Sequence, residues 1–233
     1  MPATEPAART ASAALPSSAP SRPVPADGAA RTAVRALVVV AASFLLGGLT
    51  SYAQGFLPDA ASPFANSSSG WTLLTVLLVA WFAGAPRART WHAAVLGAAS
   101  FVLLVLGYTV AADLRGFVYH PLLFGLVGVV AGPFVGVAAA WLRTQGVRAA
   151  LATALLAGIG VGEGTYGLLT VAEHTGATYW VVAGVASLVL LAAMLARRVR
   201  GTWPVVVTVA GTAVVAGAFY SAYIWLGTVG SLG

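Results

Sequence analysis

From residue 34 to residue 227 the sequence is a succession of apolar runs separated by short polar connections. A helix of about 20 residues, rising 1.5 Å per residue, crosses the roughly 30 Å hydrocarbon core of a bilayer. The sequence therefore predicts an all-α fold, an integral membrane helical bundle with about seven transmembrane helices. We expect these helices over Val34–Leu57, Trp71–Gly84, Trp91–Ala112, Tyr119–Leu142, Arg148–Val171, Tyr179–Ala196 and Trp203–Gly227, the second beginning near Asn66.

The composition favours the same class. Hydrophobic residues make up 59% of the chain and charged residues only 8%, whereas roughly a quarter of residues are charged in a soluble domain. The chain has no cysteine, and its 12 basic residues are all arginine, which excludes disulfides, thiolate metal sites and lysine Schiff bases. Because these arginines are scattered between apolar runs, the net charge of +6 indicates no nucleic-acid partner. Membrane lipid is the expected partner.

The arginines also predict an orientation. Residues 1–30, rich in Ala, Pro and Ser, are expected to form a disordered cytoplasmic tail, and residues 31–233 the transmembrane domain. Basic residues then fall on alternate connections, with Arg115 the exception: Arg31 and Arg35, Arg87 and Arg89, Arg143 and Arg148, and Arg197, Arg198 and Arg200. The positive-inside rule predicts a multi-pass protein of the cytoplasmic membrane, N-terminus inside and C-terminus outside. A signal peptide cleaved near Ala53 is the alternative, although apolar character continues through Leu57.

A weak internal repeat relates the two ends of the apolar region. At a shift of 112 residues Tyr108 falls on Tyr220, and at a shift of 114 residues Tyr52 falls on Tyr166. This suggests three helices, one connecting helix and three helices, a 3+1+3 plan with parallel repeats and a binding site between the halves. The alternative is chance, because helices built from Ala, Val, Leu and Gly often match.

The stretch "GIGVGEGTYG", Gly158 to Gly167, places one carboxylate, Glu163, among five glycines. An ionisable residue at membrane depth costs a few kcal/mol and normally turns toward a partner inside the bundle. Helical spacing puts Tyr166 and Thr170 on the face of Glu163, so we expect this polar stripe to face an interior cavity. Small residues four apart on the other faces allow neighbouring helices to approach, namely Gly158 with Gly162 and Gly160 with Gly164.

Other polar and aromatic residues are expected at the same level as Glu163. These further candidates for ligand binding are Tyr52, Gln54, Tyr108, Asp113, Arg115, Tyr220 and Tyr223. We predict that Tyr52, Tyr108 and Tyr220 meet Glu163 and Tyr166 around one cavity. Arg115 could pair with Asp113, Glu173 or Glu163. The alternative is structural, with tyrosines as interfacial anchors and Glu163 as a hydrogen-bonding link between helices.

Missing motifs narrow the function. The chain has no paired-carboxylate DxxxD, HExxH, GxSxG or phosphate-loop motif, and its three histidines lie in separate connections. No metal and no cofactor is expected, and no catalytic residue can be named. The leading hypothesis is binding or transport of a small molecule or ion at an outward-facing cavity around Glu163. The first alternative is a membrane-embedded cyclase or isomerase of a lipophilic substrate with Glu163 as general acid; the second is a structural or assembly subunit.

Five stretches carry a family resemblance: "FLLGGLTSYAQGFLP", "ANSSSGWTLLTVLLVAWFAG", "LGYTVAADLRG", "GPFVGVAAAWLR" and "LLAGIGVGEGTYGL". They resemble a bacterial family of small multi-pass membrane proteins, the domain of unknown function 6518 family, over about residues 34–200. The most specific motifs are the P-FANS-GW region and the Gly-Glu-Gly-x-Tyr segment. The resemblance implies an integral membrane protein, and it brings no established activity and no functional residue.

Overall fold

The computed structural model describes residues 26–230, with side chains from Gly28 to Gly227, so residues 1–25 of the expected tail lie outside the described part. Most of the described chain is helical, and it contains no strand. Its elements, in order, are α1 (Ala26–Ala53), the 3₁₀ turn η1 (Ser62–Asn66), α2 (Ser68–Ala83), α3 (Thr90–Leu114), α4 (Leu122–Trp141), α5 (Val147–Tyr166), the π-helical turn η2 (Gly167–Val171), α6 (Ala172–Thr175), α7 (Thr178–Arg197) and α8 (Thr202–Gly230).

Six of these helices are long and apolar enough to cross a membrane: α1, α3, α4, α5 with its continuation through η2 and α6, α7 and α8. The apolar helix α2, with 16 residues, extends only about 24 Å. The protein is therefore a multi-pass integral membrane protein with a helical-bundle fold, as predicted.

The boundaries of the first helix differ from the prediction. α1 begins at Ala26, inside the range assigned to the tail, and ends at Ala53 rather than Leu57. Alanine and arginine favour helix even where the sequence is not apolar. Beyond Ala53 the chain turns at Gly55, whose N–H donates to the Tyr52 carbonyl, before Pro58. The turn at Gly55, rather than the end of the apolar run, therefore sets the C-terminal end of α1.

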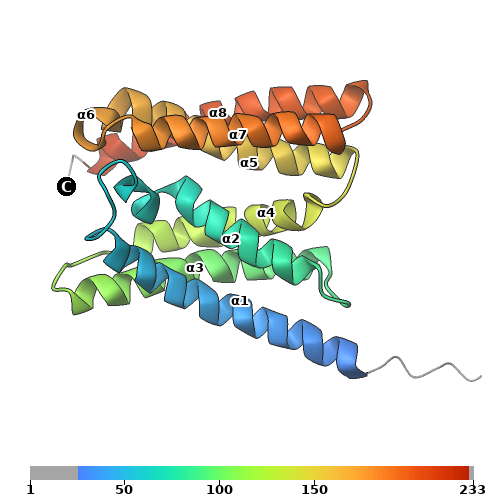
Figure 1. The fold of residues 1–233 in the computed structure, drawn as a ribbon, viewed down its shortest axis with the longest axis horizontal. Helices are drawn as coiled ribbons and strands as arrows, with labels where there is room; N and C mark the ends of the chain where they lie inside the picture. The colour runs from blue at the N-terminus through green and yellow to red at the C-terminus, as the bar shows by residue number, and fades with distance from the viewer. Residues whose placement is uncertain (1–25, 231–233) are drawn as a thin grey trace, which may run out of the picture.

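The helices form two halves. α3 packs extensively against both α1 and α4, while α5 packs against α8 and α7. In Figure 1 the first half, α1 to α4, lies on one side and the second half, α5 to α8, on the other. α2 contacts α1, α3 and α4 and also reaches α5, so it lies along the seam between the halves.

One helix contact in each half uses equivalent positions. Where α1 crosses α3, Gly48 faces the Gly107 carbonyl, and where α5 crosses α8, Gly162 faces Phe219. These two pairs are related by the same shifts, 114 and 112 residues, that align the tyrosines in the sequence. One helix contact in each half therefore uses positions related by these shifts, while the 3+1+3 plan itself stays a prediction.

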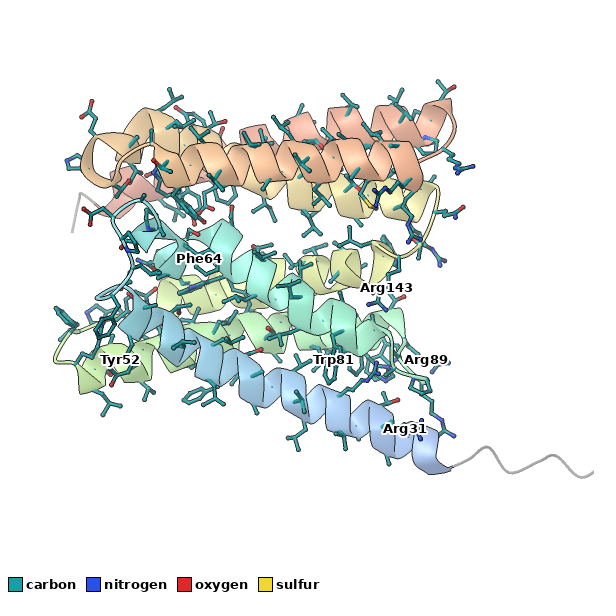
Figure 2. All side chains as sticks on the ribbon, in the orientation of Figure 1. Arg31, Tyr52, Phe64, Trp81, Arg89 and Arg143 are labelled. Carbon is teal, nitrogen blue, oxygen red and sulfur yellow. The ribbon has the colours of Figure 1, made fainter. Side chains whose placement is uncertain are left out.

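Figure 2 shows Arg31, Arg89 and Arg143 at one end of the bundle, called here the arginine end, together with Trp81. Tyr52 lies at the opposite end, the Tyr52 end. Because α2 runs toward Trp81, its first residues belong to the Tyr52 end. The alternation of arginines along the sequence therefore becomes a spatial separation.

Candidate functional site

Glu163 of α5 is buried, with 2% of its surface exposed. Its carboxylate oxygens accept hydrogen bonds from the backbone N–H groups of Ser68 and Ser69, each at 2.6 Å. These are the first residues of α2, whose N–H groups have no partner within their own helix and form the positive end of the helix dipole. The partner of Glu163 is thus a helix terminus in the other half of the bundle.

The segment before α2 builds this helix terminus. Ser67 caps the helix by accepting from the Gly70 N–H at 2.9 Å, and the Trp71 indole N–H donates to the Ala65 carbonyl at 3.2 Å. Gly70 is required there, because a Cβ would overlap the Phe64 carbonyl oxygen. The P-FANS-GW motif is therefore a compact turn and helix start that leaves two N–H groups for Glu163.

Serine side chains at the same helix start also contact the second half. The Ser67 hydroxyl hydrogen-bonds the Tyr179 hydroxyl of α7, and the Ser68 hydroxyl hydrogen-bonds the Tyr223 hydroxyl of α8. We call this set of contacts the serine latch; it joins Ser67, Ser68 and Ser69 of the first half to Glu163, Tyr179 and Tyr223 of the second.

The glycines around Glu163 let two helices approach α5 closely. On one face, Gly158 and Gly162 contact α8; on another, Gly160 and Gly164 contact α7. The predicted pairs of glycines four residues apart are therefore confirmed as contact faces. They hold α7 and α8 close enough for Tyr179 and Tyr223 to reach the serines.

A cavity of about 200 Å³ adjoins the carboxylate, between the two halves. We call it the chamber. Most of its walls are aromatic, and its lining comprises Asn66, Ser68, Trp71, Phe101, Phe124, Val127, Glu163, Tyr166, Val171, Trp180 and Tyr223. This volume is below the roughly 300 Å³ at which pockets for drug-sized ligands begin, so the chamber suits a small ligand.

A second hollow of about 330 Å³ lies at the Tyr52 end and shares three lining residues with the chamber, Asn66, Val171 and Trp180. We call it the vestibule. Its other walls are largely polar and include Gln54, Asp59 and His174. The vestibule and the chamber therefore adjoin each other at these shared walls.

A family model described as "Family of unknown function (DUF6518)" matches residues 26–228. The chain belongs to this family. The match extends beyond the resemblance noted in the sequence, since it takes in all of α1 and nearly all of α8. No curated protein and no solved structure matches the chain. In this DUF6518 protein the two most specific motifs, more than 90 residues apart, meet at the bonds between Glu163 and α2.

Of the candidates from the sequence, Glu163, Tyr166 and Tyr223 line the chamber. The ring of Tyr220 packs against that of Tyr166 with centroids 6.4 Å apart, in a second layer behind the lining. Tyr166 also contacts Tyr223, at 5.2 Å between centroids. The polar stripe on α5 therefore extends onto α8 at the chamber wall.

The prediction that Thr170 faces the cavity with Glu163 is wrong. After Tyr166 the helix continues as the π-helical turn η2, which adds a residue to the turn and rotates the residues after it about the helix axis. Val171 consequently faces the chamber, and Thr170 is exposed. Simple α-helical spacing from Glu163 does not hold beyond Tyr166.

The prediction that Tyr52 and Tyr108 share the cavity is also wrong. Tyr108 packs on Trp71 at 5.6 Å and donates to the Gln54 Oε1 at 2.7 Å, and Trp71 lies between Tyr108 and the chamber as part of its lining. Tyr52 is 44% exposed. The helix start of α2 occupies the space in which these two tyrosines were expected to meet Glu163.

Arg115 makes aromatic contacts in place of the suggested carboxylate pairing. Its guanidinium lies 5.6 Å from the ring centre of Tyr52 and 5.1 Å from that of Phe117. Asp113 is exposed. Both residues lie outside the lining of the chamber and the vestibule, whereas Gln54 lines the vestibule.

An aromatic cluster supports the chamber from the first half. Tyr119, in the connection between α3 and α4, packs on Tyr108 at 4.8 Å. Burial raises the pKa of the Tyr119 hydroxyl, so this side chain is uncharged at physiological pH.

Within residues 28–227, whose side chains are described, no three His, Asp or Glu side chains gather as metal ligands.

Four residues of the site were not predicted from the sequence: Ser68, Ser69, Trp71 and Trp180. A usable signal was present: serines directly before an apolar run are typical of a helix N-cap, and a helix start inside a membrane protein offers free N–H groups to an anion. Among the described residues, Glu163 is the one carboxylate buried in an apolar run. Pairing these two features would have indicated their contact.

Proposed function

We propose that this membrane protein binds a small organic cation in the chamber, as a binding protein or transporter. The observation that supports this most directly is one buried carboxylate, Glu163, on the wall of a small cavity whose other walls are mainly aromatic. A cation is attracted both by a carboxylate and by the faces of Trp and Tyr rings. Trp71, Trp180, Tyr166 and Tyr223 supply such rings.

The position of the chamber also supports transport. It lies between two halves that share one equivalent helix contact, and substrate sites in transporters built from repeats lie between the halves. Ser68, Glu163 and Tyr223 belong both to its lining and to the serine latch. We propose that the latch joins the halves at the Tyr52 end and opens to admit the ligand from the vestibule.

Ligand binding can be measured by tryptophan fluorescence, since Trp71 and Trp180 line the chamber. Purified protein in a neutral detergent would be titrated with choline and with 3,3-dimethyl-1-butanol, its uncharged analogue. We expect a saturable change with choline alone. Glu163→Gln keeps the side-chain size but removes the charge, and should weaken choline binding about tenfold, equivalent to 1.4 kcal/mol.

Glu173→Gln is the matched control, because Glu173 is an exposed acid on α6 and its replacement should leave the titration unchanged. Melting curves of each variant show that it is folded. An equal response to the uncharged analogue, or full choline binding by folded Glu163→Gln protein, would contradict the cation site.

We further propose that the arginine end faces the cytoplasm, which places the N-terminus inside and the vestibule outside a cytoplasmic membrane. Reporter fusions after Arg89, Arg143 and Arg198 should all report the cytoplasm. Fusions after Gly116 and Gly176, in connections at the other end, should report the outside. If any one of the fusions after Arg89, Arg143 or Arg198 reported the outside, this orientation would be wrong.

A further inference from the structure

A third hollow, separate from the chamber, runs along the seam between the halves. It has a volume of about 450 Å³ and is almost wholly apolar, with α2, α5 and α7 as its main walls. Leu73 of α2 and Val182 of α7 line it while 48% and 59% exposed. Because both residues lie in apolar helices of the membrane region, this groove opens sideways toward lipid.

The groove has the dimensions of a lipid chain. Along α7 its lining runs from Tyr179 to Leu190, which is about 16 Å of helix. This stretch starts at the second residue of α7, at the Tyr52 end, and stops about 10 Å before Arg197. Toward the arginine end the lining finishes at Leu142 and Leu190, so a chain entering there would extend toward Tyr179.

Arginines gather where the groove finishes. Arg143 directly follows Leu142, and the Nη1 atoms of Arg143 and Arg35 both approach Gly84, lying 3.0 Å and 3.4 Å from the position of a Cβ there. Arg198 donates from Nη1 to the Arg143 carbonyl at 2.8 Å. The guanidinium groups of Arg143 and Arg35 thus lie close together, and Arg198, directly after α7, contacts the backbone of Arg143.

No described carboxylate balances this charge. The acidic side chains that the structure describes are Asp59, Asp113, Glu163 and Glu173, and they lie in connections or helix ends remote from these arginines. Like charges repel, and a phosphate group relieves that repulsion through charge-assisted hydrogen bonds to guanidinium groups. Basic pockets between transmembrane helices are a known mode of recognising anionic lipid headgroups.

We infer that the groove and the arginine cluster form one binding site for an anionic phospholipid. Its phosphate is held by Arg143 and Arg35, and one acyl chain lies in the groove along α2 and α7. The site bridges the two halves, because Arg35 belongs to the first half, and the groove walls belong to both. It is independent of the cation proposed for the chamber.

The test uses the purified full-length chain, delipidated in a neutral detergent, and either dioleoyl phosphatidylglycerol or dioleoyl phosphatidylcholine. Native mass spectrometry counts retained lipid, and melting temperatures report stabilisation. We expect one phosphatidylglycerol to be retained at about tenfold lower concentration than phosphatidylcholine. Arg143→Gln should weaken phosphatidylglycerol retention about fivefold, the effect of one basic residue near a phosphate.

Two further variants assign the headgroup and the chain. Arg89→Gln removes an exposed arginine from the same end of the bundle, remote from the groove lining, and should leave retention unchanged. Ala186→Trp inserts a large ring into the groove from an exposed position on α7 and should reduce retention of phosphatidylglycerol at least fivefold while the arginines remain.

Several results would overturn the inference. One is equal retention of the two lipids, and another is an equal loss in Arg143→Gln and Arg89→Gln. Unchanged retention in Ala186→Trp would remove the groove from the site. Soluble glycerol 3-phosphate serves as a competitor without an acyl chain, and if it displaced the lipid at equal concentration, the arginines would be a free-anion site instead.

Discussion

Glu163→Ala is expected to lower the free energy of unfolding by about 2–6 kcal/mol, because it leaves two half-buried N–H groups without an acceptor at about 1–3 kcal/mol each. The donors are Ser68 and Ser69, each 2.6 Å from the carboxylate. Unfolding in mixed micelles of neutral detergent and SDS, followed by tryptophan fluorescence, would measure the loss. Glu173→Ala, at an exposed position, should change stability by no more than about 0.5 kcal/mol.

A pair of substitutions at Ser68 isolates the backbone hydrogen bond. Ser68→Ala removes only the hydroxyl that contacts Tyr223, whereas Ser68→Pro also removes the N–H that binds Glu163. Proline is tolerated at the first position of a helix, and it favours an extended residue before it. Ser67 already has φ −114° and ψ 151°, so the exchange adds little backbone strain.

We therefore expect Ser68→Pro to be less stable than Ser68→Ala by about 1–3 kcal/mol, the cost of a buried acceptor that loses its donor. In a Glu163→Ala background the two variants should be equal, because the acceptor is absent; this double-mutant cycle measures the coupling directly. If the difference persisted without Glu163, the loss would come from the backbone of α2 rather than from the bond to the carboxylate.

These experiments also separate the two roles of Glu163. A structural link requires only an acceptor, so Glu163→Gln, whose amide oxygen can take one N–H, should keep part of the stability. A cation site requires the charge, which Glu163→Gln lacks. If Glu163→Gln lost choline binding but largely kept its stability, the negative charge of Glu163 would be needed for the ligand. If binding and stability were lost equally, only the structural role of Glu163 would be supported.

The fold could be predicted from the sequence because a bilayer leaves few solutions. Every backbone polar group in hydrocarbon must be satisfied within its own helix, so apolar length alone identified most helices. The alternation of arginines along the sequence also predicted that Arg31, Arg89 and Arg143 lie at the same end of the bundle, as Figure 2 shows. The spacing of Gly158 with Gly162 was equally informative, since residues four apart share a helix face whatever that face contacts.

The candidate site could be predicted only in part, because its decisive contacts are long-range or depend on backbone geometry. Ser68 and Glu163 are 95 residues apart, and the donors are backbone N–H groups, which every residue except proline has. The π-helical turn that exposes Thr170 is not marked by any regular spacing of residues in the sequence, so it could not be predicted. Residues within one turn of Glu163, such as Tyr166, were placed correctly relative to it.

The second large effect is expected at Gly136, where α3 and α4 are in close contact. A Cβ there would overlap the Ala93 carbonyl oxygen and lie 3.0 Å from the Gly97 Cα. Both obstacles are backbone atoms, which cannot rotate away as a side chain can. In a membrane, helices associate through close packing rather than a hydrophobic driving force. Gly136→Ala should therefore lower the free energy of unfolding by about 1–3 kcal/mol.

Gly125→Ala is the matched control, because Gly125 lies in the same helix and a Cβ there meets no atom within 4 Å. This change should leave stability unchanged or raise it by up to about 1 kcal/mol, the helix-propensity gain of Ala over Gly. The same SDS titration measures both variants. Equal effects at the two positions would mean that α3 and α4 separate without cost, and the packing of the first half would then not depend on its glycines.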